Sequence, residues 1–461
     1  MKTPKKQFRF SQKLFALTVL AAFGPAHADE EEVAQFIKPD SMVSIGLGAA
    51  TGDSKDRAIF GQYNGHRLDS SNLLLEFDIV KRDDATGLWT SAEGRNLGLD
   101  NKELKFSQQK QGDWKYLLEY NETVRRDPRT INSGLVNPLT TAPTVVSLAT
   151  AGAGQNLDLD IRRKAASLSA EKWLTSSLLF EASAKNEERN GSRLSGVGLV
   201  CSDIIGTTFP CTGGTAGAIL MMPEPISSTT KQFEAKLNYS GDKYLVSGGY
   251  YGSFYRNANG SLNPLVSGNL YNPDGTVINT SLAPGSTLAG YLQQPLALPP
   301  DNQAHQFYVA GNYAFTPTTR ATFKYAYTHA TQTDDFASKG LTGAPAGVGN
   351  LGGVLDSTLA QLGVTARPMA KLTMLANLYY EDKADKTPLA LYNGAYTNNL
   401  NSSKKTTGKV EASYQLPDHY RATLGLDYAK VHRDLPVSTT MVPATSLYAL
   451  REETEEQGYR A

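Results

Sequence analysis

The sequence predicts an all-β fold, a transmembrane antiparallel up-and-down β-barrel with about 16 strands visible along the chain. Three observations lead to this prediction. The N-terminus has the pattern of a secretory leader, apolar and polar residues alternate with a period of two, and short turns alternate with long polar loops. The alternating segments are about ten residues long, the length with which a tilted strand crosses a bilayer.

The leader comes first in the chain, in residues 1–28. A basic segment precedes the apolar stretch 14–23, and the cleavage pattern Ala26-His27-Ala28 follows it. The apolar stretch is too short to remain in a bilayer as a spanning helix. We therefore expect residues 1–28 to be a signal peptide, removed on export to the periplasm.

The rest of the chain divides into residues 29–40, expected to be a periplasmic N-terminal segment, and residues 41–461, expected to be the barrel of a Gram-negative outer membrane. The precursor carries 45 Lys and Arg against 45 Asp and Glu, so loss of the basic leader leaves a mildly acidic protein. Nucleic acid is therefore not an expected partner.

The alternation is clearest between residues 102 and 121. Trp114, Tyr116 and Leu118 fall on one face of the second strand in this segment, and Lys115 and Glu119 fall on the other. A tight turn at residues 111–113 joins this strand to the one before it. The same hairpin pattern recurs around the turns 240–243, 316–319, 367–370 and 416–419.

Long polar segments separate the hairpins: 125–158, 190–230, 257–303 and 332–356. Short turns on one side and long loops on the other are typical of outer-membrane barrels, in which the short turns face the periplasm. The first four expected crossings, at 41–50, 72–82, 88–95 and 102–110, place the turn at 111–113 on that side. Counting forward gives about fifteen crossings by His432 and a sixteenth that begins near Leu450.

The last segment, 450–461, is crowded with glutamates, whereas barrels of this class usually end on an apolar strand that closes against the first. We expect the barrel to be truncated at the C-terminus and to be part of a larger one. The alternative is a complete sixteen-stranded barrel with a polar last strand.

No catalytic constellation emerges from the sequence. The five histidines from His66 onward show no repeated ligand spacing, the G-x-G-x-x-G match at 347–352 lies in a loop, and no C-x-x-C-H motif could attach a haem. Cys201 and Cys211 are expected to form a loop disulfide. We predict that the chain is not an enzyme and has no catalytic, cofactor-binding or metal-binding residues.

Charged residues recur opposite the apolar rows, and a charged side chain at the bilayer midplane costs about 2–4 kcal/mol, so they are expected to face the lumen. Both signs are present, which suits water or a polar protein surface. The candidate lumen-facing residues are Glu76, Asp78, Arg82, Glu119, Glu181, Lys185, Glu234, Lys236, Lys324, Glu381, Lys409, Glu411, Arg421 and Asp427.

Five stretches, in order, resemble the MtrB/PioB family of decahaem-associated outer-membrane barrels. They are FGQYNG at 60–65, RNLGLDNKELKF at 95–106, QGDWKYLLEYNETVRRDPRTIN at 111–132, the stretch from LPPDNQ to TQTDDF at 298–336, and LREETEEQGYRA at 450–461. Some relatives carry a C-x-x-C near the mature N-terminus, which residues 29–41 lack, and relatives are longer, with more than about twenty strands.

The resemblance implies a sheath that houses and positions a periplasmic decahaem c-type cytochrome for electron transfer across the outer membrane, with an extracellular multihaem cytochrome as a further partner. The chain would bind no cofactor itself, because its partner carries the haem. The alternative function is a general diffusion porin, which also suits a mixed lumen and long loops.

Overall fold

The computed structural model describes residues 41–64, 71–145, 152–200, 217–266, 270–271, 277–279, 293, 295–392, 396–435 and 451–461. The predicted signal peptide, the segment 29–40 and the predicted disulfide between Cys201 and Cys211 lie outside the described residues. In the described part, no helix is both long and apolar enough to span a membrane.

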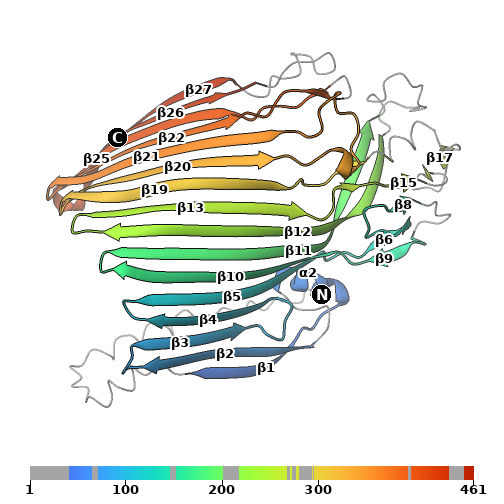
Figure 1. Cartoon of the computed structure of the whole chain (residues 1–461), viewed down its shortest axis with the longest axis horizontal. Helices are drawn as coiled ribbons and strands as arrows, with labels where there is room; N and C mark the ends of the chain where they lie inside the picture. Colours follow the sequence, from blue (N-terminus) through green and yellow to red (C-terminus); the bar gives the residue numbers. More distant parts are fainter. Residues whose placement is uncertain are drawn as a thin grey trace, which may run out of the picture.

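A single antiparallel sheet of 16 strands dominates the structure (Figure 1). Each strand pairs with its neighbour along the chain, so the connectivity is up-and-down, as predicted, and the sixteenth strand follows the segment after His432. The strands are β1 (Met42–Ala49), β2 (Ser71–Asp83), β3 (Leu88–Arg95), β4 (Lys102–Lys110), β5 (Trp114–Arg126), β10 (Asp160–Thr175), β11 (Leu178–Val200), β12 (Gly217–Ser240), β13 (Tyr244–Asn257), β19 (Asn302–Thr316), β20 (Thr319–Gln332), β21 (Gly353–Met369), β22 (Leu372–Asp385), β25 (Ser403–Gln415), β26 (Arg421–Arg433) and β27 (Glu453–Arg460).

The sheet curves, and its tight turns gather at one end, on the left in Figure 1, while the long connections lie at the other end. The connection from β1 to β2 contains helix α2 (Ser54–Asn64), and η2 (Ala337–Lys339) lies between β20 and β21; η3 (Pro417–His419) forms the tight turn after β25. Small strands occupy the other long connections: β6 (Ile131–Ser133), β7 (Leu135–Val136), β8 (Thr144–Val145), β9 (Gln155–Leu157), β14 (Ser261–Leu262), β15 (Leu265–Val266), β16 (Leu270–Tyr271), β17 (Val277–Asn279), β18 (Leu296–Ala297), β23 (Leu391–Tyr392) and β24 (Tyr396–Thr397).

The prediction of a loop over residues 190–230 is wrong in part. Strand β11 continues to Val200 and β12 begins at Gly217, and the two pair residue by residue from Gly191 with Ile226 to Val200 with Gly217. The segment looked like a loop because it is rich in Gly, Ser and Pro. The extra pairing rests on the backbone ladder, whose hydrogen bonds do not depend on an apolar face.

The register separates the side chains into two faces that stay consistent from β1 to β27. Paired residues of an antiparallel sheet point to the same side. On one side, here called the apolar face, Phe180 pairs with Leu237 and Leu378 pairs with Leu362. On the opposite side, the polar face, Glu181 pairs with Lys236.

Few apolar side chains of the described residues are buried, and the rows on the apolar face are largely exposed, Leu237 at 45% and Leu424 at 67%. In water such a surface would be a severe liability, whereas in hydrocarbon it is the expected lipid contact. At the two edges of the sheet, β1 pairs with β2 and β27 pairs with β26, and the described parts of β1 and β27 are not paired with each other.

Candidate functional site

The candidate functional surface is the polar face, because the register brings every charged residue named from the sequence to that side. Cross-strand residue pairs connect one strand to the next on this face, from Glu76 on β2, through Glu119 on β5 and Lys236 on β12, to Asp427 on β26. The remaining members occupy the same face by the same pairing: Asp78, Arg82, Glu181, Lys185, Glu234, Lys324, Glu381, Lys409, Glu411 and Arg421.

The central part of this surface is an ion-paired and hydrogen-bonded patch on β11 and β12. Lys236 Nζ lies 2.9 Å from Glu181 Oε2. Asn238 Nδ2 donates to the other carboxylate oxygen of Glu181 at 2.5 Å, and Ser247 Oγ donates to Asn238 Oδ1 at 2.6 Å. Lys236 and Glu181 therefore neutralise each other, whereas Glu234, on the same face of β12, accepts a hydrogen bond from Tyr308 Oη.

A second cluster lies near the C-terminal edge. Lys409 Nζ is 3.1 Å from Glu411 Oε2, and Arg460 NH2 is 3.5 Å from Glu411 Oε2 and 3.1 Å from Asp427 Oδ2. The arginine of β27 thus bridges two carboxylates on β25 and β26. This arrangement ties the polar last strand to its neighbour through side chains as well as backbone.

The other candidates divide into paired and unpaired residues. Glu381 pairs with Lys383 at 3.1 Å, Lys185 with Glu187 at 3.0 Å, and Glu119 with Lys105 at 3.7 Å; Arg82 contacts Asp84. Five candidates take part in none of the ion pairs among the described residues: Glu76, Asp78, Glu234, Lys324 and Arg421. The structure therefore spreads the candidates over the whole face and does not gather them at one focus, as a catalytic site would require.

Sequence reasoning missed a group of arginines on the same face, near the end with the long connections. Arg163 pairs directly with Arg189, and Arg125 lies one strand away with its guanidinium carbon 5.6 Å from the ring centre of Tyr63 on α2. The alternation in residues 160–200 was the signal that could have found them. Like charges directly opposite each other repel, and here Glu187 offsets part of the repulsion, because its Oε1 lies 3.7 Å from Arg163 NH1.

Two histidines that the sequence left unconnected are cross-strand neighbours on the apolar face. His305 pairs with His329; Tyr250 Oη lies 2.7 Å from His305 Nδ1, and His329 Nδ1 lies 2.6 Å from Asp356 Oδ1. Each ring thus has its own partner. Within the described ranges, no three or more His, Cys, Asp or Glu side chains are placed to hold a metal ion.

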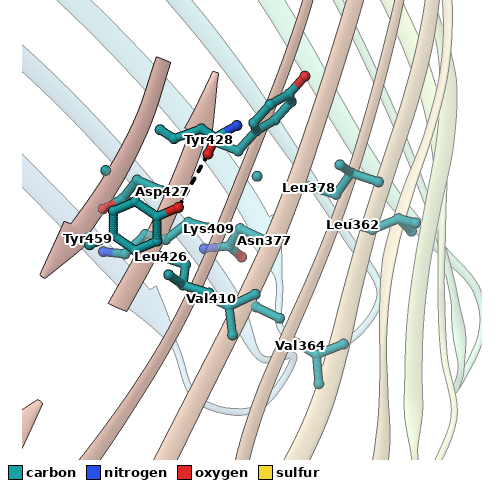
Figure 2. A pocket seen from close by; sticks show the side chains of 14 residues that line it. Leu362, Val364, Asn377, Leu378, Lys409, Val410, Leu426, Asp427, Tyr428 and Tyr459 are labelled. Atoms are coloured by element: carbon teal, nitrogen blue, oxygen red, sulfur yellow. Dashed lines mark hydrogen bonds between the residues drawn. The ribbon is translucent and has the colours of Figure 1, made fainter. Parts of the chain in front are cut away.

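The apolar face also has a hollow near β27, with a volume of about 500 Å³ (Figure 2). Leu362, Leu378 and Val410 contribute to its wall, and Gly408 contributes to its floor. A Cβ at Gly408 would meet nothing within 4 Å, so the space above this residue is open. Most of the lining is apolar, and three of its polar members, Asn377, Lys409 and Asp427, belong to the polar face. This hollow fits the acyl chains that surround a membrane strand.

Comparisons with known proteins agree with this description. A family model described as "Putative outer membrane beta-barrel porin, MtrB/PioB" matches residues 53–461. The outer membrane protein MtrB of Shewanella baltica (strain OS185) is 22% identical over 475 residues, which cover 92% of this chain and 61% of that protein. The chain therefore spans less than two thirds of the length of this curated relative.

Among solved structures, the ferric-catecholate import receptor Fiu from E. coli K12 in its closed form aligns with a TM-score of 0.39 and 14% identity, over 79% of this chain and 57% of that one. The copper transporter OprC aligns with a TM-score of 0.38 and 12% identity, over 81% of this chain and 52% of that one. The match of the family model over most of the sequence decides the assignment: this chain belongs to the MtrB/PioB family of outer-membrane β-barrel proteins.

Proposed function

We propose that this chain is a wall component of an electron conduit across the outer membrane. Its polar face lines a lumen that houses and positions a periplasmic decahaem c-type cytochrome, which carries all the haem. An extracellular multihaem cytochrome would exchange electrons with the outer end of that partner. In this proposal the chain supplies insulation and position and performs no chemistry of its own.

The observation that carries the proposal is the continuity of the polar face across all 16 strands of the sheet. On this face, charges of both signs are present and many of them are matched locally, as in the contact between Glu181 and Lys236. A surface of matched charges and hydroxyls can meet a hydrated protein surface without leaving a buried unpaired charge, which would be costly. The apolar face, in contrast, has the exposed aromatic and aliphatic rows that hydrocarbon requires.

A general diffusion porin is the second candidate. The matching family description contains the word porin, and a wall with mixed charges and long connections would also serve a water-filled channel. The two functions differ in what fills the lumen: a haem protein in the first, and water and small solutes in the second.

The experiment that separates them is purification of the protein from its native outer membrane in mild detergent, followed by a haem-stained gel and a visible absorption spectrum. The proposal predicts a co-purifying haem protein at a fixed ratio, and low ion conductance of the intact complex in a planar bilayer. A colourless preparation that conducts ions would contradict the sheath and support the porin.

Two charge-reversal variants, one on each face of the sheet, test whether the haem protein contacts the polar face. Lys324 lies on the polar face without an ion-pair partner among the described residues, so its charge is free for a lumen partner. Lys324→Glu should reduce the co-purified haem several-fold at low salt and less at high salt, because the lost attraction is electrostatic. The control is Lys81→Glu on the apolar face of β2, which should leave the haem content unchanged at equal membrane yield. Equal haem content in both variants would argue against a partner at Lys324.

A further inference from the structure

A groove of about 1120 Å³ lies mainly on the apolar face, over β5 and β10 to β13. These strands lie near the middle of the sheet in Figure 1. Three of its lining residues, Ser167, Lys185 and Gln232, belong to the polar face, on which the proposed function rests, and the others belong to the apolar face. The groove has an apolar half toward the middle of the strands and a charged half toward the end with the long connections. The pairing register of the strands determines which side chains line each half.

The apolar half has a low floor between taller walls. Ala166 and Ala184 form the floor, on β10 and β11. Leu118 and Leu168 form one wall, each 48% exposed, and Phe254 on β13 forms the other. Methyl side chains between large apolar ones leave a channel along the strands, and its width and chemistry suit a hydrocarbon chain.

The charged half begins one residue pair further along the strands. Lys231 pairs with Asn186 and with Phe254, and Arg256 lies two residues beyond Phe254, opposite Thr229. Glu188 also lines this half and faces Lys164 across the strands. The cations therefore outnumber the carboxylates around this end of the groove.

The Lys231 ammonium takes part in none of the ion pairs of the described residues, and it is exposed. Arg256 NH1 lies 3.0 Å from Asp301 Oδ2, and its side chain remains 65% exposed, so its guanidinium keeps further donors that point to the surroundings. An ammonium and a guanidinium on adjacent strands can bind one phosphate together, the first as a point charge and the second as a fork.

We infer that this groove binds a phosphorylated glycolipid of the outward-facing leaflet, with a phosphate held by Lys231 and Arg256 and an acyl chain lying over Ala166 and Ala184. Three observations support a phosphorylated glycolipid as the ligand of this groove. The cationic end lies at the end with the long connections, which faces outward in barrels of this kind. The apolar half continues from it toward the bilayer centre. Clustered Lys and Arg beside lipid-facing positions are the usual recognition element for anionic headgroups.

The test uses the purified full-length protein in detergent, titrated with diphosphoryl lipid A and followed by native mass spectrometry. Unmodified protein should retain one lipid A. The double variant Lys231→Gln with Arg256→Gln should weaken binding by about 25-fold, roughly fivefold for each lost cation near a headgroup. Phosphatidylglycerol, with one phosphate and two acyl chains, should bind the unmodified protein more weakly than lipid A.

Two matched controls test the two halves separately. Ala184→Phe fills the floor of the groove and should also weaken lipid A binding, whereas Ala182→Phe, on the same face two residues away and outside the groove, should leave it unchanged. Lys81→Gln removes a lysine from the same face at the opposite end of the sheet and should have no effect.

Every variant is first compared with the unmodified protein by its heat-modifiable migration in gels, so that loss of folding is recognised. Lipid A binding of unchanged strength in the double variant, or in Ala184→Phe, would overturn the inference. The outcome is independent of the proposed function, since haem co-purification is measured on the same variants and concerns the opposite face.

Discussion

Tyr308 on β19 reaches across the whole width of β13 to bond with Glu234 on β12, and Gly249 leaves the room for it. Tyr308 Oη donates to Glu234 Oε1 at 2.5 Å. Gly249 pairs with Lys236 on one side and with Tyr308 on the other. A Cβ at position 249 would lie 2.9 Å from Tyr308 Oη and 2.7 Å from the Ala235 carbonyl oxygen. The polar face is thus packed across three strands.

Gly249→Ala should destabilise the protein by about 1–3 kcal/mol, because the new methyl group meets a backbone carbonyl oxygen that cannot move without the strand. The measurement is the urea midpoint of unfolding from lipid vesicles. Gly408→Ala is the matched control, since a Cβ there meets nothing within 4 Å, and it should be neutral or slightly stabilising. Equal shifts of the urea midpoint in the two variants would contradict the close packing around Gly249.

Glu122 is the most deeply placed carboxylate of an ion-paired group at the outer end of β5. Its side chain is 3% exposed, and its carboxylate contacts Arg162, Lys102 at 3.3 Å and the Tyr120 hydroxyl at 3.1 Å. Glu122→Gln should cost about 3 kcal/mol in unfolding free energy, because it removes the carboxylate partner of Lys102 and leaves Arg162 with only Asp100, 3.7 Å away.

The control for this substitution is Glu119→Gln, on the same strand and also paired with a lysine. Glu119 is 41% exposed and its lysine partner is 3.7 Å away, so its loss should cost less than about 1 kcal/mol. An equal cost for the two substitutions, measured by the same urea unfolding, would mean that Glu122 is solvated in the folded protein.

Adjacent residues on β22 test the cost of charge on each face. Leu378→Lys puts an ammonium on the apolar face and should lower stability by about 2–4 kcal/mol if that face contacts hydrocarbon. Asn377→Lys puts the same ammonium on the polar face, one residue away, and should cost less than about 1 kcal/mol, from repulsion by Lys409 on the next strand. The readout is folding yield into vesicles together with the urea midpoint; a reversed order would exchange the assignment of the two faces.

The alternation of the strands and the side on which the charges lie could be predicted from the sequence, because both depend on a local period of two. The charged residues from Glu76 to Asp427 lie on one face because side chains alternate along each strand and because paired residues of neighbouring strands point to the same side. The ends of β11 and β12 could not be predicted: beyond Asn190 the residues Gly, Ser and Pro interrupt the alternation, and only the backbone pairing marks the segment as strand.

Helix α2 was missed for a related reason. Its sequence has no apolar stripe, and its start is set by Asp53, whose carboxylate accepts the backbone N–H of Asp56 at 2.8 Å. The contact of Tyr308 with Glu234 and the neighbourhood of His305 and His329 also escaped prediction, since they need the register between strands that are distant in the sequence.

The turn between β4 and β5 should respond to acid. The ammonium of Lys172 beside Asp113 lowers the pKa of that carboxyl below its ordinary value. A lowered pKa in the folded protein means that the carboxylate stabilises the turn fully above the ordinary carboxyl pKa. This contribution is lost as the pH falls from there through the lowered pKa of the folded protein. Asp113→Asn should therefore lower the urea midpoint at pH 7 and have a progressively smaller effect as the pH falls below about 4. A difference that persists at low pH would exclude the ion pair as its cause.

The most direct test of the two-faced sheet is spin-label accessibility along β12, in a variant with Cys201 and Cys211 replaced by Ser, reconstituted in vesicles. Single cysteines at positions 233 to 238 are labelled in turn and exposed to oxygen, which dissolves in lipid, or to a nickel chelate, which stays in water. The labels at Phe233, Ala235 and Leu237 should respond mainly to oxygen, and those at Glu234, Lys236 and Asn238 to the chelate. Six positions with the same response, or an alternation in the opposite phase, would contradict a sheet with lipid on one side and a polar interior on the other.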